Sequence, residues 1–275
     1  MMNSETRKAS IRSRRAAIRE IGFLRRKSWK WAKAEFRKAL DWLLFDPEAL
    51  KGAECLWNTR HKKVYKVQIP EHLGGWLVAY KKYDGFQLFR HIFLPAQTAR
   101  EAANYRMLEQ LGLPMAHLLA AGEFRKNFIL QSTFLVTEFA TGFYDGRLFM
   151  PGGKFRDNLP LRRIFSEKNL RELAKVHKIH CHLRSFKPYN MLWKPAPEQH
   201  SNDIEIIWID VANCHFRPPF LFPRYVVKDL FSFFKQMRLP QTEQNELLEV
   251  YWKENPDCGL TLSELRDKVP SQWDS

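Results

Sequence analysis

Apolar and polar residues alternate with a period of two in several short runs, and this pattern predicts β-strands. The runs are residues 63–69, 76–81, 128–131, 133–139 and 204–209. The first two flank Pro70 to Gly75, a turn-forming segment, so we expect them to form an antiparallel hairpin. Two such hairpins and one helix would build a small lobe of sheet and helix.

Helical periodicity appears on both sides of a glycine- and proline-rich segment that follows Gly142. One helix is expected from Thr98 to Gly112, because Thr98 and Glu101 have the spacing of a capping box. After Gly142 we expect further helices at residues 166–177 (capped by Ser166), 224–237 and 242–253, and from Thr261 or Ser263 onward. The second half of the chain is therefore predicted to be mainly helical.

Residues 4–45 are strongly basic and carry an apolar stripe at helical intervals, which predicts an amphipathic helix. A basic face opposite a face of Trp, Phe and Leu suits a helix that lies on an anionic membrane. The stripe suits equally well a helix that packs on the protein's own body. Asp46-Pro47 then ends the segment.

Composition narrows the functional classes. The chain has 275 residues, of which 45% are hydrophobic, and this fraction indicates a packed globular protein. Its formal charge of +15 indicates acidic partners, which could be phosphate-bearing molecules, nucleic acid or an anionic membrane. Four scattered cysteines form no CxxC pair, so we expect neither a zinc site nor disulfides, and a reducing cytoplasm fits best. We find no signal peptide and no spanning segment, and therefore expect a soluble or peripherally attached protein.

The first candidate chemistry is a lysine at the end of an inner strand. Val78-Ala79-Tyr80-Lys81 resembles the V-A-I-K pattern, whose lysine holds nucleotide phosphates. A carboxylate on the following helix is needed to pair with Lys81, and Glu101 or Glu109 could supply it. We prefer Glu101 because it lies near the start of the helix, although its side chain is also the one that would complete the capping box.

The second candidate is a pair of oxygen ligands at strand ends. Asn190 precedes the apolar residues 191–193, and Asp210 ends the strand expected at 204–209. Magnesium takes few protein ligands and leaves room for phosphate oxygens, so this pair suits Mg²⁺ in phosphoryl transfer.

These motifs, in this order, resemble the bacterial lipopolysaccharide kinase (Kdo/WaaP) family of the protein-kinase-like fold. The resemblance covers about residues 50–237 and rests on short runs: residues 173–177, 187–192, 209–210, 100–101, 111–114, 135–139 and 227–230. It implies an α+β, two-lobe fold with a small sheet-plus-helix N-lobe at 47–141, a mainly helical C-lobe at 142–275, and a basic helical extension at 1–46.

The resemblance also implies roles for individual residues. ATP and Mg²⁺ would be the cofactors, with Lys81, Glu101 and Glu138 at the nucleotide, Asn190 and Asp210 on the metal, and Lys187 in the catalytic loop. The family acts on heptose or Kdo sugars of the lipopolysaccharide inner core, at the cytoplasmic face of the inner membrane. We therefore expect an anionic glycolipid as the acceptor.

The main departure from the pattern lies in the catalytic loop. In the kinase loop H-R-D-x-x-x-x-N, counting back from Asn190 places Ser185 at the catalytic Asp and Leu183 at the His. A serine hydroxyl is too weak a base to take the acceptor's proton. We interpret the nearby His180 and His182 as ordinary loop histidines or as histidines with satisfied hydrogen bonds. Two hypotheses follow, an ATP-dependent kinase and a pseudokinase that binds nucleotide as a regulatory or scaffold module. A nucleic-acid binder is a third and weaker one, because the chain has basic charge but no recognised nucleic-acid motif.

Overall fold

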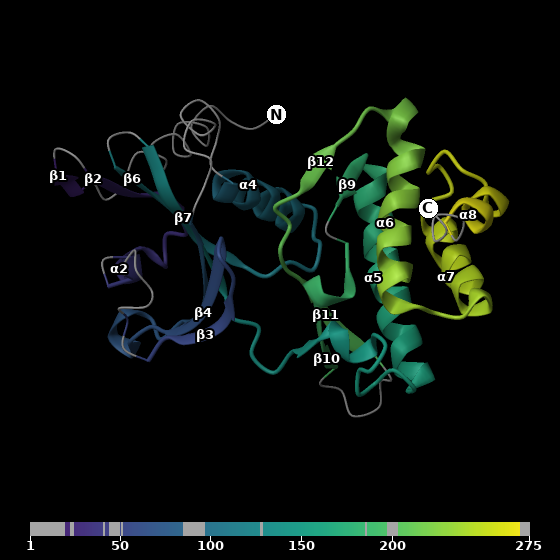
Figure 1. Cartoon of the computed structure of the whole chain (residues 1–275), viewed down its shortest axis with the longest axis horizontal. Helices are drawn as coiled ribbons and strands as arrows, with labels where there is room; N and C mark the ends of the chain where they lie inside the picture. Colours follow the sequence, from purple (N-terminus) through teal and green to yellow (C-terminus); the bar gives the residue numbers. More distant parts are fainter. Residues whose placement is uncertain are drawn as a thin grey trace. The chain divides into compact units, whose positions relative to one another are not determined.

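The computed structural model describes residues 20–22, 25–40, 42–43, 50, 52–84, 97–126, 129–184, 186–196 and 203–269. The chain forms two compact units (Figure 1). The first comprises residues up to Met107 together with Ala116–Phe139, and the second comprises Leu108–Met115 together with the chain from Ala140. None of the helices in the described ranges is long and apolar enough to cross a lipid bilayer.

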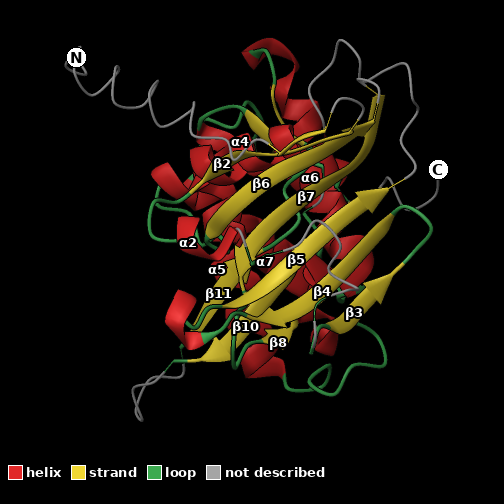
Figure 2. Cartoon of the chain, turned by 90° about the vertical axis from the view of Figure 1, so that its left-hand side faces the viewer, coloured by secondary structure: helices red, strands yellow, loops and turns green. Residues whose placement is uncertain are grey.

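The first unit is built on an antiparallel sheet of seven strands in the order β1-β2-β6-β7-β5-β4-β3. The strands are β1 (Glu20–Gly22), β2 (Arg25–Ala32), β3 (Glu54–Asn58), β4 (Lys62–Gln68), β5 (Leu77–Asp84), β6 (Leu118–Lys126) and β7 (Ile129–Glu138). Figure 2 shows β6, β7, β5, β4 and β3 side by side across the sheet. The other elements in the described part of this unit are α2 (Arg37–Leu40), η2 (Glu71–Leu73) and most of α4 (Gln97–Gln110).

The predicted hairpin is present: β4 and β5 pair antiparallel, with Lys66 opposite Ala79. Its connection contains η2 and two glycines with positive φ, Gly74 at 113° and Gly75 at 62°. A residue with a Cβ rarely adopts this conformation, so the glycines allow the chain to reverse. On one face of the sheet, Tyr80 packs between Trp29 and Phe134, with ring centroids 6.5 and 5.8 Å away. These rings belong to the apolar core of the unit.

The prediction of an amphipathic helix over residues 4–45 is wrong for the described part of this segment, which forms strands β1 and β2 and only a single helical turn, α2. Residues 25–32 form β2, which pairs antiparallel with β6 and extends the sheet. A register shift between Trp29 and Trp31 lets Trp29 enter the core, whereas Trp31 lies 5.3 Å from the guanidinium of Arg106 on α4. The apolar residues of this segment therefore pack on the protein's own sheet. The segment forms a strand because the edge of β6 supplies hydrogen-bond partners for its backbone, and the local periodicity does not reveal these partners.

Two further predictions in this unit are corrected. The expected strands at 128–131 and 133–139 are one strand, β7, and its partner β6 lies in a segment for which the sequence analysis predicts no strand. β6 was missed because it lacks alternation: Leu118 to Gly122 is buried on both faces. The helix expected at Thr98–Gly112 is confirmed as α4, and Gly112 follows its end with φ of 71°.

The second unit consists mainly of helices. They are α5 (Leu159–Lys178), α6 (Phe222–Met237), α7 (Gln241–Glu254) and α8 (Leu262–Lys268), with the short turns η3 (Gly146–Phe149), η4 (Pro188–Asn190) and η5 (Pro219–Leu221). α5 begins earlier than predicted, since the side chain of Asn158 rather than Ser166 accepts the capping hydrogen bond, from the amide of Leu161. α8 starts at the predicted capping box of Thr261 and Glu264.

Two small antiparallel sheets hold the loops of this unit. One has the order β11-β10-β8 and consists of β8 (Tyr144–Asp145), β10 (Met191–Pro195) and β11 (Ile204–Trp208). The other pairs β9 (Cys181–Leu183) with β12 (Cys214–Phe216). The chain runs from β9 through the predicted catalytic loop to β10, and from β11 through Asp210 to β12, so the two sheets fix both ends of both loops.

Candidate functional site

In the first unit, a buried ion pair joins β5 to α4. The ammonium of Lys81 lies 2.9 Å from Oε1 of Glu101, and their side chains are 7% and 0% exposed. The hydroxyl of Tyr83, two residues along the same face of β5, donates to the other carboxylate oxygen at 2.9 Å. Both oxygens of Glu101 are therefore engaged, which is the condition under which a buried carboxylate is tolerated.

The structure decides between the two carboxylates considered from sequence. Glu101 contacts Lys81, and its carboxylate does not complete a capping box, because Thr98 already lies inside α4. One helical turn further on, the ring of Tyr105 lies 5.8 Å from the ammonium of Lys81. The lysine is thus held between a carboxylate and an aromatic face, and it is a pre-organised cation within an inner strand rather than at its end.

In the second unit, Asn190 and Asp210 lie at adjacent ends of paired strands. Met191 pairs with Trp208 in the β10–β11 ladder, and the amide of Ile209 donates to the carbonyl of Asn190 at 2.9 Å. β11 is anchored to α5, because the indole of Trp208 donates to the side-chain oxygen of Asn169 at 2.7 Å. The structure therefore brings the backbone of Asn190 against that of Ile209, the residue before Asp210.

Asp210 has φ of 62°, a left-handed conformation that is uncommon for a residue other than glycine. Such strained residues persist where the surrounding structure imposes them, and they cluster at functional sites. The donor set, an amide oxygen and a carboxylate, is the kind that Mg²⁺ takes. No group of three or more His, Cys, Asp or Glu residues that could hold a metal occurs in the described ranges. Asn190 and Asp210 thus fit the few oxygen ligands that a protein supplies to Mg²⁺.

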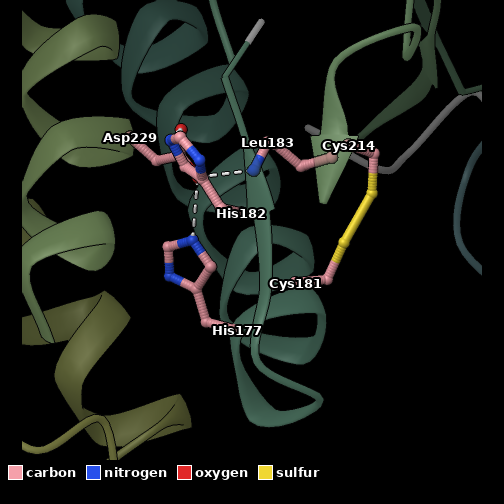
Figure 3. Close-up of a disulfide and its surroundings, with 6 residues drawn as sticks. All are labelled: His177, Cys181, His182, Leu183, Cys214 and Asp229. Atoms are coloured by element: carbon pink, nitrogen blue, oxygen red, sulfur yellow. Dashed lines mark hydrogen bonds and ion pairs between the residues drawn. A yellow bond between two sulfur atoms is a disulfide. The ribbon is translucent and has the colours of Figure 1, made fainter. Parts of the chain in front are cut away.

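A buried carboxylate that sequence reasoning had not assigned holds the strand before the catalytic loop. Asp229 of α6 is 1% exposed and accepts the amide of Leu183 at 2.7 Å (Figure 3). Its oxygens also lie 3.2 Å from Nε2 of His177 and 3.3 Å from Nε2 of His182. Asp229 therefore positions β9, although it lies far along the sequence from Leu183.

The pKa shifts of Asp229 and His177 follow from their burial and their hydrogen bonds. Burial is the main cause that lowers the pKa of His177, although Asp229 acts against it. Burial raises the pKa of Asp229, but its hydrogen bonds with His177 and His182 outweigh this effect and keep that pKa low. Nδ1 of His177 lies 2.7 Å from the hydroxyl of Tyr251 on α7. A neutral His177 that donates to Asp229 and accepts from Tyr251 satisfies all three groups.

A disulfide joins Cys181 of β9 to Cys214 of β12 (Figure 3). This corrects our expectation that the chain has no disulfide. The two cysteines are 33 residues apart in sequence with no local motif, and only the pairing of β9 with β12 brings them together. The bond links the strand before the catalytic loop to the strand after Asp210. Cys55 and Cys258 are free thiols.

The other predicted site residues lie as follows. Lys187 is the N-cap residue that precedes η4, and its ammonium lies 5.5 Å from the centroid of the Tyr189 ring. Glu138 is exposed at the end of β7. His182 is buried against Asp229, in agreement with a structural role. Ser185 lies outside the described residues.

Comparisons with known proteins support the fold. No protein-family model matches the chain, and no curated protein matches it by sequence. Among solved structures, the chain is similar to WaaP in complex with acyl carrier protein, with a TM-score of 0.58 and 18% identity, over 83% of this chain and 87% of that one. The two-lobe protein-kinase-like fold, with an antiparallel-sheet N-lobe and a helical C-lobe, is therefore confirmed.

We predict that the Lys81–Glu101 pair is a strong contributor to stability. Glu101→Gln should lower the free energy of unfolding by about 3 kcal/mol, because it leaves a buried ammonium without a counter-charge. The double variant Lys81→Met/Glu101→Gln should lose less than the sum of the two single variants. Urea unfolding followed by circular dichroism measures both effects.

Lys82→Met is the matched control for this experiment. Lys82 is the next residue on β5 and lies 3.6 Å from the partly exposed Asp84, so its loss should cost less than about 1 kcal/mol. Equal losses for Lys82→Met and Glu101→Gln, or strictly additive single variants, would contradict the prediction.

We also predict an acid-sensitive stability that depends on His177. Its pKa in the folded chain lies below the ordinary 6.5, so under pH 6.5 the unfolded chain binds a proton that the folded chain does not. The free energy of unfolding should therefore fall as the pH drops below 6.5, by up to about 1.4 kcal/mol per pH unit from this residue. Asp229 adds no slope there, since its ordinary pKa of 3.8 lies below the range.

His177→Gln should be less stable than wild type at pH 7 but should lose less stability between pH 6.5 and pH 5.5, as measured by urea titrations at each pH. His72→Gln is the control, because His72 is exposed and its loss should keep the wild-type slope. A His177→Gln slope equal to that of wild type would show that His177 does not carry the effect.

Proposed function

We propose that the protein is an ATP-dependent phosphotransferase of the lipopolysaccharide-kinase type, which phosphorylates a hydroxyl of an inner-core sugar, heptose or Kdo. One observation carries the proposal: the buried Lys81–Glu101 pair in the sheet unit occurs together with the adjacent Asn190 and Asp210 in the helical unit. Their order along the chain is that of the kinase-like fold, and the similarity to WaaP is consistent with it.

Each residue has a proposed role in this reaction. Lys81, oriented by Glu101, binds phosphate oxygens of ATP, and the exposed end of β7 at Glu138 contacts the nucleotide. Asn190 and Asp210 supply oxygen ligands to Mg²⁺, which neutralises charge on the phosphates when bound. Lys187 brings a further positive charge to the loop between β9 and β10.

The proposed acceptor is an anionic, lipid-linked sugar at the cytoplasmic face of the inner membrane. The formal charge of +15 favours such an acceptor. WaaP was solved with acyl carrier protein, which makes acyl carrier protein a candidate partner of this chain as well.

A second candidate function is that of a pseudokinase, and Ser185 is the observation that favours it. Phosphoryl transfer depends more on positioning and charge neutralisation than on a base, so loss of the carboxylate would slow turnover and spare nucleotide binding. Such a protein would act in envelope biogenesis as a nucleotide-binding regulator or scaffold.

We predict that ATP with Mg²⁺ stabilises the protein. At a ligand concentration about 100 times Kd, the thermal midpoint should rise by about 5 °C, because only the folded state binds the ligand. Lys81→Met and Asp210→Ala should abolish the shift. Asp203→Ala, which removes an exposed carboxylate paired with Lys168, should keep it. If folded wild-type protein shows no shift, the nucleotide site is not there.

A measurement of phosphoryl transfer distinguishes the kinase hypothesis from the pseudokinase hypothesis. With ATP, Mg²⁺ and dephosphorylated inner-core lipopolysaccharide, a kinase transfers labelled phosphate to the sugar in an Asp210-dependent manner. For a pseudokinase, wild type should be inactive and Ser185→Asp should gain activity, by about 100-fold or more over background. A wild-type rate equal to that of Ser185→Asp would contradict the pseudokinase hypothesis.

A further inference from the structure

The segment between Asp210 and Asp229 contains basic residues and no acidic ones. Three of its cations, Arg217, Arg224 and Lys228, surround the ring of Tyr225, at 4.7, 4.8 and 5.5 Å from its centroid. Arg224 also donates to the hydroxyl of Tyr225 at 2.7 Å. The hydrogen bond from Arg224, assisted by the charges of all three cations, lowers the pKa of Tyr225. A concentrated positive potential therefore exists at the start of α6.

These cations are not neutralised within the described part of the chain. None of the three forms a salt bridge there, and Nε of Arg217 is buried without a hydrogen-bond partner. The cations on α5 and α7 behave differently: Arg163 pairs with Glu246 at 2.8 Å, and Lys253 pairs with Glu249 at 2.8 Å. The positive charge beside Tyr225 is thus a local feature of the surface and calls for an external anion.

Two large exposed apolar side chains lie close to these cations along the sequence. Phe216 at the end of β12 is 60% exposed, and Phe220 in η5 is 81% exposed. Phe220 follows Pro218 and Pro219, whose fixed φ angles restrict the turn that presents it. Exposed aromatic rings are unfavourable in water, and groups of them mark interaction surfaces.

We propose that Phe216, Arg217, Phe220, Arg224 and Lys228 form a basic–aromatic surface that docks on an anionic lipid bilayer. The cations bind the phosphates of lipid headgroups, and the two phenyl rings insert at the boundary between headgroups and acyl chains. A soluble phosphate compound would satisfy the cations and leave both rings in water, so the rings identify a membrane as the occupant.

The inference deepens the proposed function and rests on it for its biological meaning. β12 and α6 follow directly after Asp210 in the chain, and β12 is linked to β9 by the Cys181–Cys214 disulfide. A bilayer bound to this surface would present lipid-linked sugars to the helical unit that carries the proposed metal ligands. A lipid-linked acceptor would then be concentrated by the membrane before it is bound.

The test is co-sedimentation of the full chain, without nucleotide, with vesicles of phosphatidylcholine containing about one third phosphatidylglycerol. We expect binding to these vesicles and none to phosphatidylcholine alone. Arg224→Gln/Lys228→Gln should weaken binding by about 25-fold, at about fivefold for each cation near an anionic surface. Phe216→Ser/Phe220→Ser should weaken it by about tenfold, because the rings no longer insert.

Matched controls separate this surface from general charge and hydrophobicity. Lys154→Gln/Lys235→Gln removes the same charge from two other exposed positions, and Leu159→Ser removes a side chain that is also 60% exposed. Both controls should bind within about twofold of wild type when salt screens distant charges. Circular dichroism and thermal melts confirm that each variant is folded.

Three results would overturn the inference. The first is that the wild-type chain does not bind anionic vesicles, and the second is that a surface variant binds them as well as its control variant does. The third is that inorganic phosphate at matched ionic strength displaces the chain from the vesicles while Phe216→Ser/Phe220→Ser binds them as well as wild type. The last would indicate a site for soluble phosphate. Failure of the proposed function gives a different result. A chain that binds vesicles, but whose thermal midpoint does not rise with ATP and Mg²⁺, has this surface and lacks the nucleotide site.

Discussion

A carboxylate that is removed from water must be neutralised by its neighbours, and two such carboxylates organise this protein. Glu101 ties α4 to β5 through Lys81 and Tyr83. Asp229 ties α6 to β9 through the amide of Leu183, with His177 and His182 around it. Because an unpaired buried charge costs several kcal/mol, each carboxylate requires its partners to stay in place. Each unit thereby keeps the elements that carry candidate site residues in one fixed arrangement.

This rigidity suits phosphoryl transfer, in which the protein mainly positions groups and neutralises charge. Lys81 is held by contacts on several sides, and Asn190 and Asp210 are held by the β10–β11 ladder. The substitution at Ser185 affects a different part of the chemistry, the removal of the acceptor's proton. A chain with the proposed nucleotide and metal ligands can therefore still differ from an active kinase in its catalytic loop.

Local patterns predicted the elements whose partners are close in sequence. The β4–β5 hairpin and the helices α4, α6, α7 and α8 follow from alternation, helical periodicity and capping residues. The strands β2 and β6 could not be found in this way, because β2 pairs with a strand that lies far along the chain and β6 is buried on both faces. The basic residues around β2 also resembled the polar face of a helix.

The same limit applies to the site. Sequence placed a lysine, two possible carboxylates and two oxygen ligands in the order of a known fold, but only the three-dimensional contacts select Glu101 and bring Asn190 next to Ile209. His177 and Asp229 were within runs that supported the resemblance, yet no local signal assigned them a shared role. The disulfide was missed for a similar reason, since cysteine spacing carries no information when the pairing is set by two short strands.

The distribution of charge connects the site to its surroundings. A formal charge of +15 is a property of the whole chain and does not distinguish one acidic partner from another. In the helical unit, however, many exposed cations on α5, α7 and α8 have carboxylate partners, whereas the cations between Asp210 and Asp229 have none in the described ranges. The proposed docking surface, which combines uncompensated charge with two exposed phenyl rings, is more specific than net charge, because it fits a partner that is anionic and apolar at once. Among the acidic partners that composition allows, an anionic lipid surface meets both requirements.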